Sequence, residues 1–140
     1  VHLLQSKDRI HRLGLSDDQY TQYYYHQLSY QTEDGLWRTV LDDPGSYEEI
    51  SASAGIAAAM LARGNVLHSK YIQKSIKGLL ANVSEDGKVM NVSGGTAVMD
   101  SKEDYRGISR DWIQGWGQGL ALAFFSTLLI SDQISKDGAL

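Results

Sequence analysis

The sequence contains no cysteine and only one proline, Pro44, in 140 residues. Without thiols the chain has neither a disulfide framework nor a metal site built from thiolates, and this absence fits a reducing compartment. Proline interrupts helices, so its scarcity leaves helices free to run through most of the chain. The chain is therefore held together without disulfide or metal–thiolate cross-links.

Positive charge and long apolar runs are also scarce. The formal net charge is -4, and no basic patch is present that could neutralise the phosphates of a nucleic acid. The longest apolar run, residues 120–130, is too short to cross a bilayer. The first residues lack the basic stretch and apolar core of a signal peptide. We therefore expect neither nucleic acid nor a membrane as a partner.

Several signatures of chemistry are absent as well. The four histidines show no metal-ligand spacing with one another, so we expect no metal site. The sequence has no GxSxG motif, P-loop or dinucleotide fingerprint, which leaves serine hydrolase and nucleotide chemistry without support.

What the sequence does contain is a series of helix signals. Residues 16–19 (Ser-Asp-Asp-Gln) form a capping box that predicts a helix from there to about residue 31. Ser46 is the predicted cap of a second helix over residues 47–63, which Gly64 and Asn65 close. This second helix consists almost entirely of small residues, which indicates an inner helix in a crowded core.

Two further helices are expected. Ser69 is the predicted start of one, whose apolar stripe comprises Ile72, Ile76, Leu79, Leu80 and Val83. The last helix spans about residues 115–131 and follows a polar loop over residues 93–111. We expect one domain over residues 1–134 and a flexible tail over residues 135–140.

A tripeptide recurs and indicates an internal repeat. Glu33-Asp34-Gly35 returns as Glu85-Asp86-Gly87, an offset of 52 residues. Each copy follows a helix and precedes a short β-like run, over residues 36–41 and 89–92. A unit of about 50 residues with two helices predicts stacked α-hairpins, as in a toroid or solenoid. The fold class is therefore all-α.

The stretch over residues 112–119 (Trp-Ile-Gln-Gly-Trp-Gly-Gln-Gly) is the best candidate for a binding site. An indole stacks well on the apolar face of a sugar, and a carboxamide both donates to and accepts from hydroxyl groups. Glycine allows a ligand to come close to the backbone. The pattern favours a polar ligand pocket, and the alternative is a glycine-rich turn whose tryptophans simply pack.

Several blocks resemble one known family. They are Tyr-Gln-Thr-Glu-Asp-Gly-Leu-Trp at residues 30–37, Val-Leu-Asp-Asp-Pro at 40–44, Tyr-Glu-Glu-Ile-Ser-Ala-Ser-Ala at 47–54, Ala-Arg-Gly at 62–64, Gly-Gly-Thr at 94–96 and Gln-Gly-Trp-Gly-Gln-Gly at 114–119. Together they resemble glycoside hydrolase family 105, the unsaturated rhamnogalacturonyl hydrolases, whose fold is close to that of the family 88 unsaturated glucuronyl hydrolases. The resemblance covers about residues 16–133.

The resemblance implies an (α/α)6 barrel of twelve helices, of which this chain is similar to the C-terminal portion. It implies hydration of the C4–C5 double bond of a terminal unsaturated uronic acid in pectin-derived oligosaccharides, without a cofactor, in the bacterial cytoplasm. The family's catalytic aspartate and its Trp-x-Arg-Gly-Asn-Gly-Trp block belong to parts that this sequence lacks. We therefore expect no catalytic residue in this chain.

The residues expected to bind the substrate share the predicted pocket end of the helices. They are Trp37, Arg38, Thr96, Trp112, Gln114, Trp116 and Gln118.

A slice of a ring leaves apolar edges open, and several hundred Å2 of such surface costs on the order of 10 kcal/mol. We therefore expect self-association or pairing with a separate N-terminal half. Two other interpretations stay open at this stage. One is a non-catalytic carbohydrate-binding or assembly module of the helical-repeat type, and the other is a truncated gene product without a function of its own.

Overall fold

The computed structural model describes residue 14, residues 16–62 and residues 69–137. In these parts of the chain the regular elements are helices: α2 (Asp17–Ser29), α3 (Ile50–Ala62), α4 (Lys70–Leu80), the short α5 (Lys102–Arg106) and α6 (Gly115–Asp137). Two isolated β-bridges, Arg38 with Glu48 and Val83 with Val89, mark the expected β-like segments. The all-α prediction is confirmed for the described residues.

Two helix starts follow the local sequence. The Ser16 hydroxyl accepts the backbone N–H of Gln19, and the Gln19 side chain accepts the backbone N–H of Ser16, so the capping box that begins α2 is present. The Ser69 hydroxyl accepts the backbone N–H of Ile72 and caps α4. Such caps satisfy N–H groups that have no partner within the helix.

The predicted cap of the small-residue helix was wrong. Helix α3 begins at Ile50 rather than at residue 47, because Ser46 is buried and its hydroxyl accepts the backbone N–H of Val40. The carboxylate of Glu49 caps α3 instead, by accepting the backbone N–H groups of Ser51 and Ala52. The predicted closing residues Gly64 and Asn65 lie outside the described residues.

The last two helices differ from the prediction in detail. Leu79 of α4 is buried, whereas Leu80, assigned to the same stripe, is 53% exposed because the next helical position turns away from the core. Helix α6 continues to Asp137, so residues 135–137 of the expected tail are helical. Residues 138–140 lie outside the described part, and the domain boundary at residue 134 stays a prediction.

The internal repeat has the same hydrogen bonds in both copies. Thr32 and Ser84, which are 52 residues apart, each donate their N–H to a carbonyl four residues on, Leu36 O and Lys88 O, at 2.9 Å. Each hydroxyl also accepts the N–H of that same later residue. The glycine within each turn has a positive φ, 84° at Gly35 and 81° at Gly87. The copies are therefore structural equivalents.

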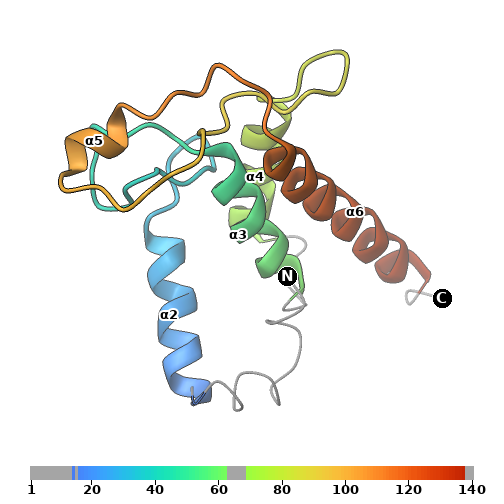
Figure 1. Ribbon diagram of the computed structural model, residues 1–140. Helices are drawn as coiled ribbons and strands as arrows, with labels where there is room; N and C mark the ends of the chain where they lie inside the picture. The colour runs from blue at the N-terminus through green and yellow to red at the C-terminus, as the bar shows by residue number, and fades with distance from the viewer. Residues whose placement is uncertain (1–13, 15, 63–68, 138–140) are drawn as a thin grey trace.

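The repeat pairs α2 with α3 and α4 with α6 (Figure 1). In the view of Figure 1, α3 and α6 both begin at the end of the molecule that carries the loops and run away from it. Helix α3 packs along α6, where the leucine Leu120 lies 3.6 Å from a Cβ placed on Gly55. Helix α4 also contacts α3. The core contains Trp37, Ile50 and Phe124, all essentially inaccessible to solvent. The structure is thus two stacked α-hairpins whose inner helices are parallel neighbours.

The inner helices are also equivalent at their fourth positions, Ser53 in α3 and Gln118 in α6, which are 65 residues apart. The Ser53 hydroxyl accepts the N–H of Trp37, the second residue after the glycine of the first turn. The Gln118 carboxamide accepts the N–H of Val89 and donates to its carbonyl, and Val89 is the second residue after the glycine of the second turn. Each inner helix thus fixes the segment that follows the preceding turn.

Candidate functional site

The polar loop over residues 93–111 lies against the turn at residues 42–45. Arg106 donates from Nε to Oδ2 and from Nη2 to Oδ1 of Asp43, both at 2.7 Å. The Asp43 carboxylate is nearly inaccessible to solvent, and Arg106 also donates to Glu103. A planar guanidinium that holds a carboxylate with two bonds fixes orientation as well as distance. This pair is therefore the main anchor of the loop.

The electrostatics of the anchor follow from this geometry. The hydrogen bonds from Arg106 hold the pKa of Asp43 below its ordinary value of 3.8, against a desolvation effect that acts the other way. The same bonds raise the pKa of Arg106. Both groups are therefore charged under physiological conditions, and the pair is an ion pair rather than a neutral hydrogen bond.

Two further cations of the loop contact the same region. The ammonium of Lys102 lies 3.0 Å from Oδ1 of Asp42. The guanidinium carbon of Arg110 lies 4.2 Å from the centre of the Tyr47 ring. Both side chains are more exposed than Asp43, so they add less to stability than the Arg106 anchor does. The three cations, at residues 102, 106 and 110, hold one side of the loop.

Glu49 fixes the beginning of the loop. Its carboxylate caps α3, accepts the Ser51 hydroxyl at 2.9 and 3.0 Å, and accepts the backbone N–H of Ser93 at 3.0 Å. The residue is 4% exposed. A buried carboxylate is stable when donors surround it, and here they come from both α3 and the loop. The loop closes on itself through the Gly94 N–H and the Ser109 carbonyl at 2.8 Å.

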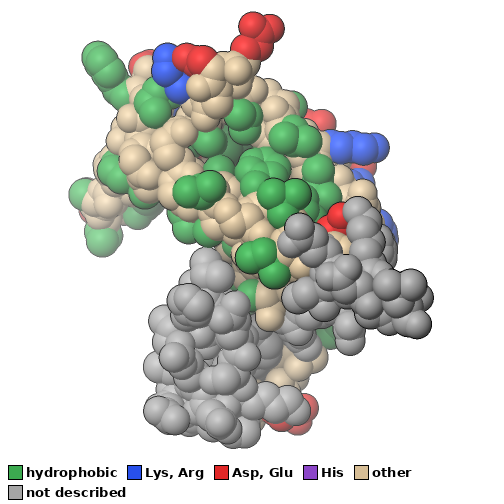
Figure 2. Space-filling view, turned by 90° about the vertical axis from the view of Figure 1, so that its right-hand side faces the viewer, with side chains coloured by type: hydrophobic (Ala, Val, Ile, Leu, Met, Phe, Trp, Pro, Cys, Tyr) green, Lys and Arg blue, Asp and Glu red, His purple; other side chains and the backbone are tan. Residues whose placement is uncertain are grey.

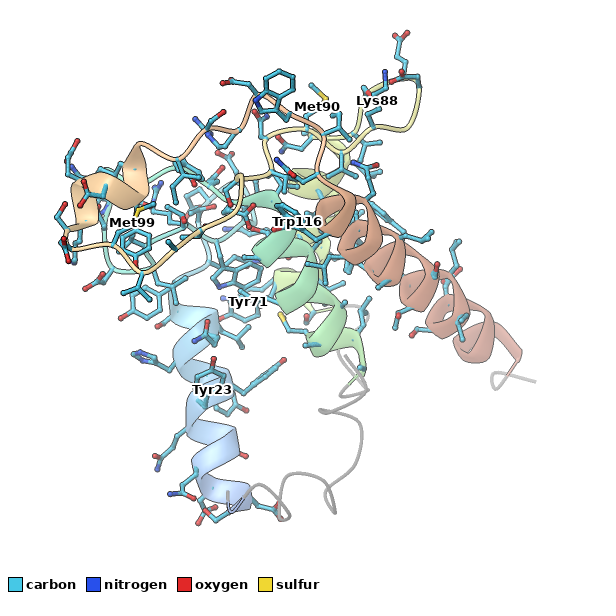
Figure 3. The ribbon with its side chains drawn as sticks, in the orientation of Figure 1. Tyr23, Tyr71, Lys88, Met90, Met99 and Trp116 are labelled. Carbon is cyan, nitrogen blue, oxygen red and sulfur yellow. The ribbon has the colours of Figure 1, made fainter. Side chains whose placement is uncertain are left out.

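The tryptophan-rich stretch follows the anchored loop. Both of its indoles are accessible to solvent. Trp112 is 74% exposed and Trp116 is 48% exposed, while Gln114 between them is partly buried. Trp116 lies in the first turn of α6, at the end of the molecule where the inner helices begin (Figure 3). The alternative in which both indoles simply pack is not what the structure shows. The stretch presents two large apolar surfaces beside polar groups.

Two other predicted site residues have structural roles. Trp37 is fully buried, and its indole N–H donates to the Gln27 carbonyl at 2.7 Å. Both ends of the Gln118 carboxamide bond the backbone of Val89. In this structure neither side chain is free to meet a ligand.

The remaining two, Arg38 and Thr96, lie in loops. Arg38 is partly buried and donates from Nη1 to the carbonyl of Ser46 at 2.9 Å. Thr96 is exposed, and its hydroxyl donates to the Gly94 carbonyl at 3.4 Å. Among the described residues, no hydrogen bond joins any two of the seven predicted side chains. Trp112, Gln114 and Trp116 lie within five consecutive residues of the chain.

The acidic residues near the stretch act locally. The Asp104 carboxylate belongs to the capping box that begins α5 at Ser101. The Asp111 carboxylate accepts the hydroxyl of Ser109 at 2.8 Å. Within the ranges that the structure covers, no cluster of three or more metal-binding side chains occurs, and no helix has the length and apolarity needed to span a membrane.

The loop anchors were missed by sequence reasoning. Lys102, Arg106 and Arg110 are spaced four residues apart, and Asp42 and Asp43 are adjacent in a turn. This regular basic spacing was the available signal. Alone it also fits a solvated helical face, so it does not identify the acidic partner.

Stacked helix pairs with parallel inner helices are the architecture of an (α/α) toroid. The sequence profile of Glycosyl Hydrolase Family 88 matches residues 13–130, and the chain belongs to this family.

Among curated proteins, the chain is 56% identical over 99 residues to Unsaturated rhamnogalacturonyl hydrolase YesR of Bacillus subtilis (strain 168). The match covers 71% of this chain and 28% of the relative. The chain thus spans just over a quarter of that protein.

Solved structures agree. A possible member of the GH105 family from Klebsiella pneumoniae superposes with a TM-score of 0.70 at 27% identity, over 89% of this chain and 36% of that one. Another, from Salmonella enterica, superposes with a TM-score of 0.66 at 28% identity, over 90% and 36%. The two hairpins are therefore part of an (α/α)6 toroid, the fold of these relatives.

Proposed function

We propose that the chain is part of an enzyme that hydrates the C4–C5 double bond of a terminal unsaturated uronic acid in rhamnogalacturonan-derived oligosaccharides. The observation that carries the proposal is the 56% identity to a curated unsaturated rhamnogalacturonyl hydrolase. The exposed indoles at the end of the molecule where the inner helices begin are consistent with a sugar site there. We further propose that the reaction takes place in the bacterial cytoplasm, on imported oligosaccharides.

In this proposal the described residues supply a sugar-binding surface. Trp112 and Trp116 offer faces on which a sugar ring can stack, and Gln114 offers a carboxamide beside them. Arg38 and Thr96 belong to the same proposed site, whereas the side chains of Trp37 and Gln118 bond the backbone of Gln27 and of Val89.

The proton donor of the reaction comes from outside the described residues. The acids nearest to the stretch in sequence, Asp104 and Asp111, cap a helix and bond a neighbouring serine. The reaction needs a group that protonates the vinyl ether carbon and activates water for addition to the other carbon. A separate N-terminal part would supply that group and cover the open faces.

The test separates binding from turnover. Tryptophan fluorescence follows binding of an unsaturated galacturonyl-rhamnose disaccharide, and loss of the ultraviolet absorbance of its conjugated double bond follows hydration. We expect the wild-type chain to bind, Trp112→Ala and Trp116→Ala to lose binding, and Tyr25→Ala to bind normally. Tyr25 is the matched control because it is an exposed aromatic residue on α2.

The outcomes distinguish the two functions. Turnover that appears when the remaining hairpins of a family relative are added supports the enzyme. Binding without turnover in every such mixture supports a carbohydrate-binding module instead. Absence of binding by the wild-type chain, alone and in those mixtures, overturns the proposed site.

A further inference from the structure

The three cations of the loop over residues 93–111 differ in how they are neutralised. The ammonium of Lys102 and the guanidinium of Arg106 each pair with an aspartate of the turn at residues 42–45. Arg110, the third, forms no ion pair within the part of the chain that the structure describes. Its positive charge is therefore the one in this loop that no described carboxylate compensates.

Tyr47 holds the guanidinium of Arg110. The guanidinium carbon lies 4.2 Å from the centre of the Tyr47 ring, and the face of an aromatic ring attracts a cation. The hydroxyl oxygen of Tyr47 is buried, so the surroundings fix the ring. A guanidinium lies on a ring through its flat face, which leaves the N–H donors at its edges available. Among the described residues these donors have no acceptor.

Arg110 lies next to the tryptophan-rich stretch in the chain. It precedes Trp112 by two residues, so their Cα atoms are at most about 7 Å apart. Both side chains are exposed. Asp111, between them, uses its carboxylate to accept a hydrogen bond from the hydroxyl of Ser109. A sugar ring that stacks on Trp112 therefore has its substituents within reach of a long cationic side chain.

Other positive charge near the stretch is scarce. The chain has a formal net charge of -4, which repels an anionic sugar. Figure 2 looks onto the side of the molecule that carries α6, where hydrophobic side chains predominate and Lys and Arg side chains lie near the edges of the described surface. Lys88, on the second turn of the repeat, is paired with Asp86. An acidic ligand of the stretch thus depends on Arg110 for a counter-charge from the described loop.

We propose that Arg110 binds a carboxylate group of the sugar substrate through the edge of its guanidinium, while the sugar stacks on the neighbouring indoles. A planar guanidinium and a planar carboxylate fit each other through two parallel hydrogen bonds. The inference rests on the proposed function, in which the substrate contains uronic acids. Arg110 then gives the site its preference for acidic over neutral sugars.

A rhamnogalacturonan-derived oligosaccharide offers this carboxylate at two places. One is the terminal unsaturated uronic acid, and the other is a galacturonic acid further along the oligosaccharide. Three ligands separate these cases: the unsaturated galacturonyl-rhamnose disaccharide, the tetrasaccharide that contains one more galacturonyl-rhamnose unit, and the disaccharide whose carboxylate has been reduced to a neutral CH2OH group. Tryptophan fluorescence measures the affinity for each.

The variants change one charge at a time. Arg110→Gln removes the cation at an exposed position, and Arg110→Lys keeps the charge but loses the planar edge. Lys102→Met is the matched control, because it also removes one positive charge from the loop and Lys102 is already paired with Asp42. Circular dichroism checks the helical content of each variant.

We expect Arg110→Gln to bind the acidic sugar about tenfold more weakly than the wild type, and Arg110→Lys to fall between the two. The neutral disaccharide should bind equally to the wild type and to Arg110→Gln. Added salt should narrow the difference for the acidic sugar, since salt screens exposed charges. A loss already seen with the disaccharide assigns the contact to the unsaturated uronic acid, and a loss seen only with the tetrasaccharide assigns it to the second one.

Three results would overturn the inference while the proposed function stands, because the wild type binds sugar in each. The first is equal affinity of the wild type and Arg110→Gln for both acidic sugars. The second is an equal loss for the acidic and the neutral disaccharide, which would make Arg110 a structural residue of the loop. The third is the same loss in Lys102→Met. A wild-type chain that binds no sugar, alone and with the remaining hairpins of a family relative, overturns the site and this inference together.

Discussion

Arg106 donates hydrogen bonds to both carboxylate oxygens of Asp43, 63 residues away in sequence, and both bonds are 2.7 Å long. Gly45 lies beneath the same guanidinium, where an added Cβ would be 3.1 Å from it. The pair joins the turn before α3 to the loop before α6. It therefore links the two hairpins at the end of the molecule where the tryptophans are exposed.

Breaking this pair is expected to loosen the loop while the helices stay folded. Asp43→Asn removes the charge, and Arg106→Lys removes the two-pronged contact while keeping the charge. In both variants we expect faster hydrogen exchange at the backbone amides of Gly94 and Gly107, measured by mass spectrometry, with unchanged exchange in the middle of α3. Lys102→Met is the control, since an exposed pair contributes about 0–1 kcal/mol. Equal effects of all three substitutions would contradict the anchor.

The anchor also predicts a dependence of stability on acidity. The pKa of Asp43 in the folded chain lies below its ordinary value of 3.8, so the unfolded chain takes up the proton first as the pH falls. The stabilisation from this group is complete above that ordinary value and is lost as the pH falls through the folded pKa. We expect Asp43→Asn to lose less stability than the wild type on acidification below about pH 4, measured by urea unfolding. Parallel curves for both proteins would contradict this.

Helix caps were predictable from the sequence where the two hydrogen-bonded residues lie close together in it. The caps at Ser16 and Ser69 bond residues three positions on, and both were predicted. The cap at Ser46 failed because its hydroxyl accepts an N–H from the far side of a turn. The contact of Glu49 with Ser93, 44 residues away, depends on the tertiary fold and was not predicted.

The candidate site divides in the same way. The exposed indoles were indicated by composition, whereas burial of Trp37 depends on its fit between α2 and α3. Gln118 carries the same carboxamide as Gln114, yet it sits one helical turn inside α6, where Val89 meets it. Residue type alone cannot separate a ligand contact from a backbone contact. The repeat could have made the distinction, because Ser53 occupies the equivalent position.

The two equivalent glycines provide a matched pair for testing the repeat. Both have a positive φ, so alanine costs about 1–2 kcal/mol at either position. A Cβ at Gly35 would also lie 2.3 Å from the backbone of Lys74, whereas nothing lies within 4 Å at Gly87. We expect Gly35→Ala to lower the free energy of unfolding by about 1–3 kcal/mol more than Gly87→Ala. Similar losses in chemical denaturation would mean that the first turn is not packed against α4.

Gln118 is expected to stabilise the fold rather than to contact the sugar. Gln118→Ala leaves the N–H and carbonyl of Val89 without partners, which costs about 1–3 kcal/mol in unfolding experiments. Gln114 is a partly buried residue of the site stretch, and Gln114→Ala is expected to cost less than that and to weaken binding of the unsaturated disaccharide. A Gln118→Ala variant of unchanged stability that fails to bind the sugar would restore Gln118 to the ligand site.

The adjacent residues Glu48 and Glu49 test the hydrogen bonds by which Glu49 holds the start of the loop. Glu49 accepts from Ser51, Ala52 and Ser93, so Glu49→Gln places an NH2 donor among these donors. We expect a loss of about 1–3 kcal/mol in the free energy of unfolding, because buried donors lose their acceptor. Faster exchange of the Ser93 amide should accompany it. Glu48→Gln is the control, since Glu48 is only partly buried and pairs with Arg38 through a backbone bridge. If Glu48→Gln lowered the free energy of unfolding as much as Glu49→Gln, the loss of surface charge rather than the hydrogen bonds of Glu49 would account for the result.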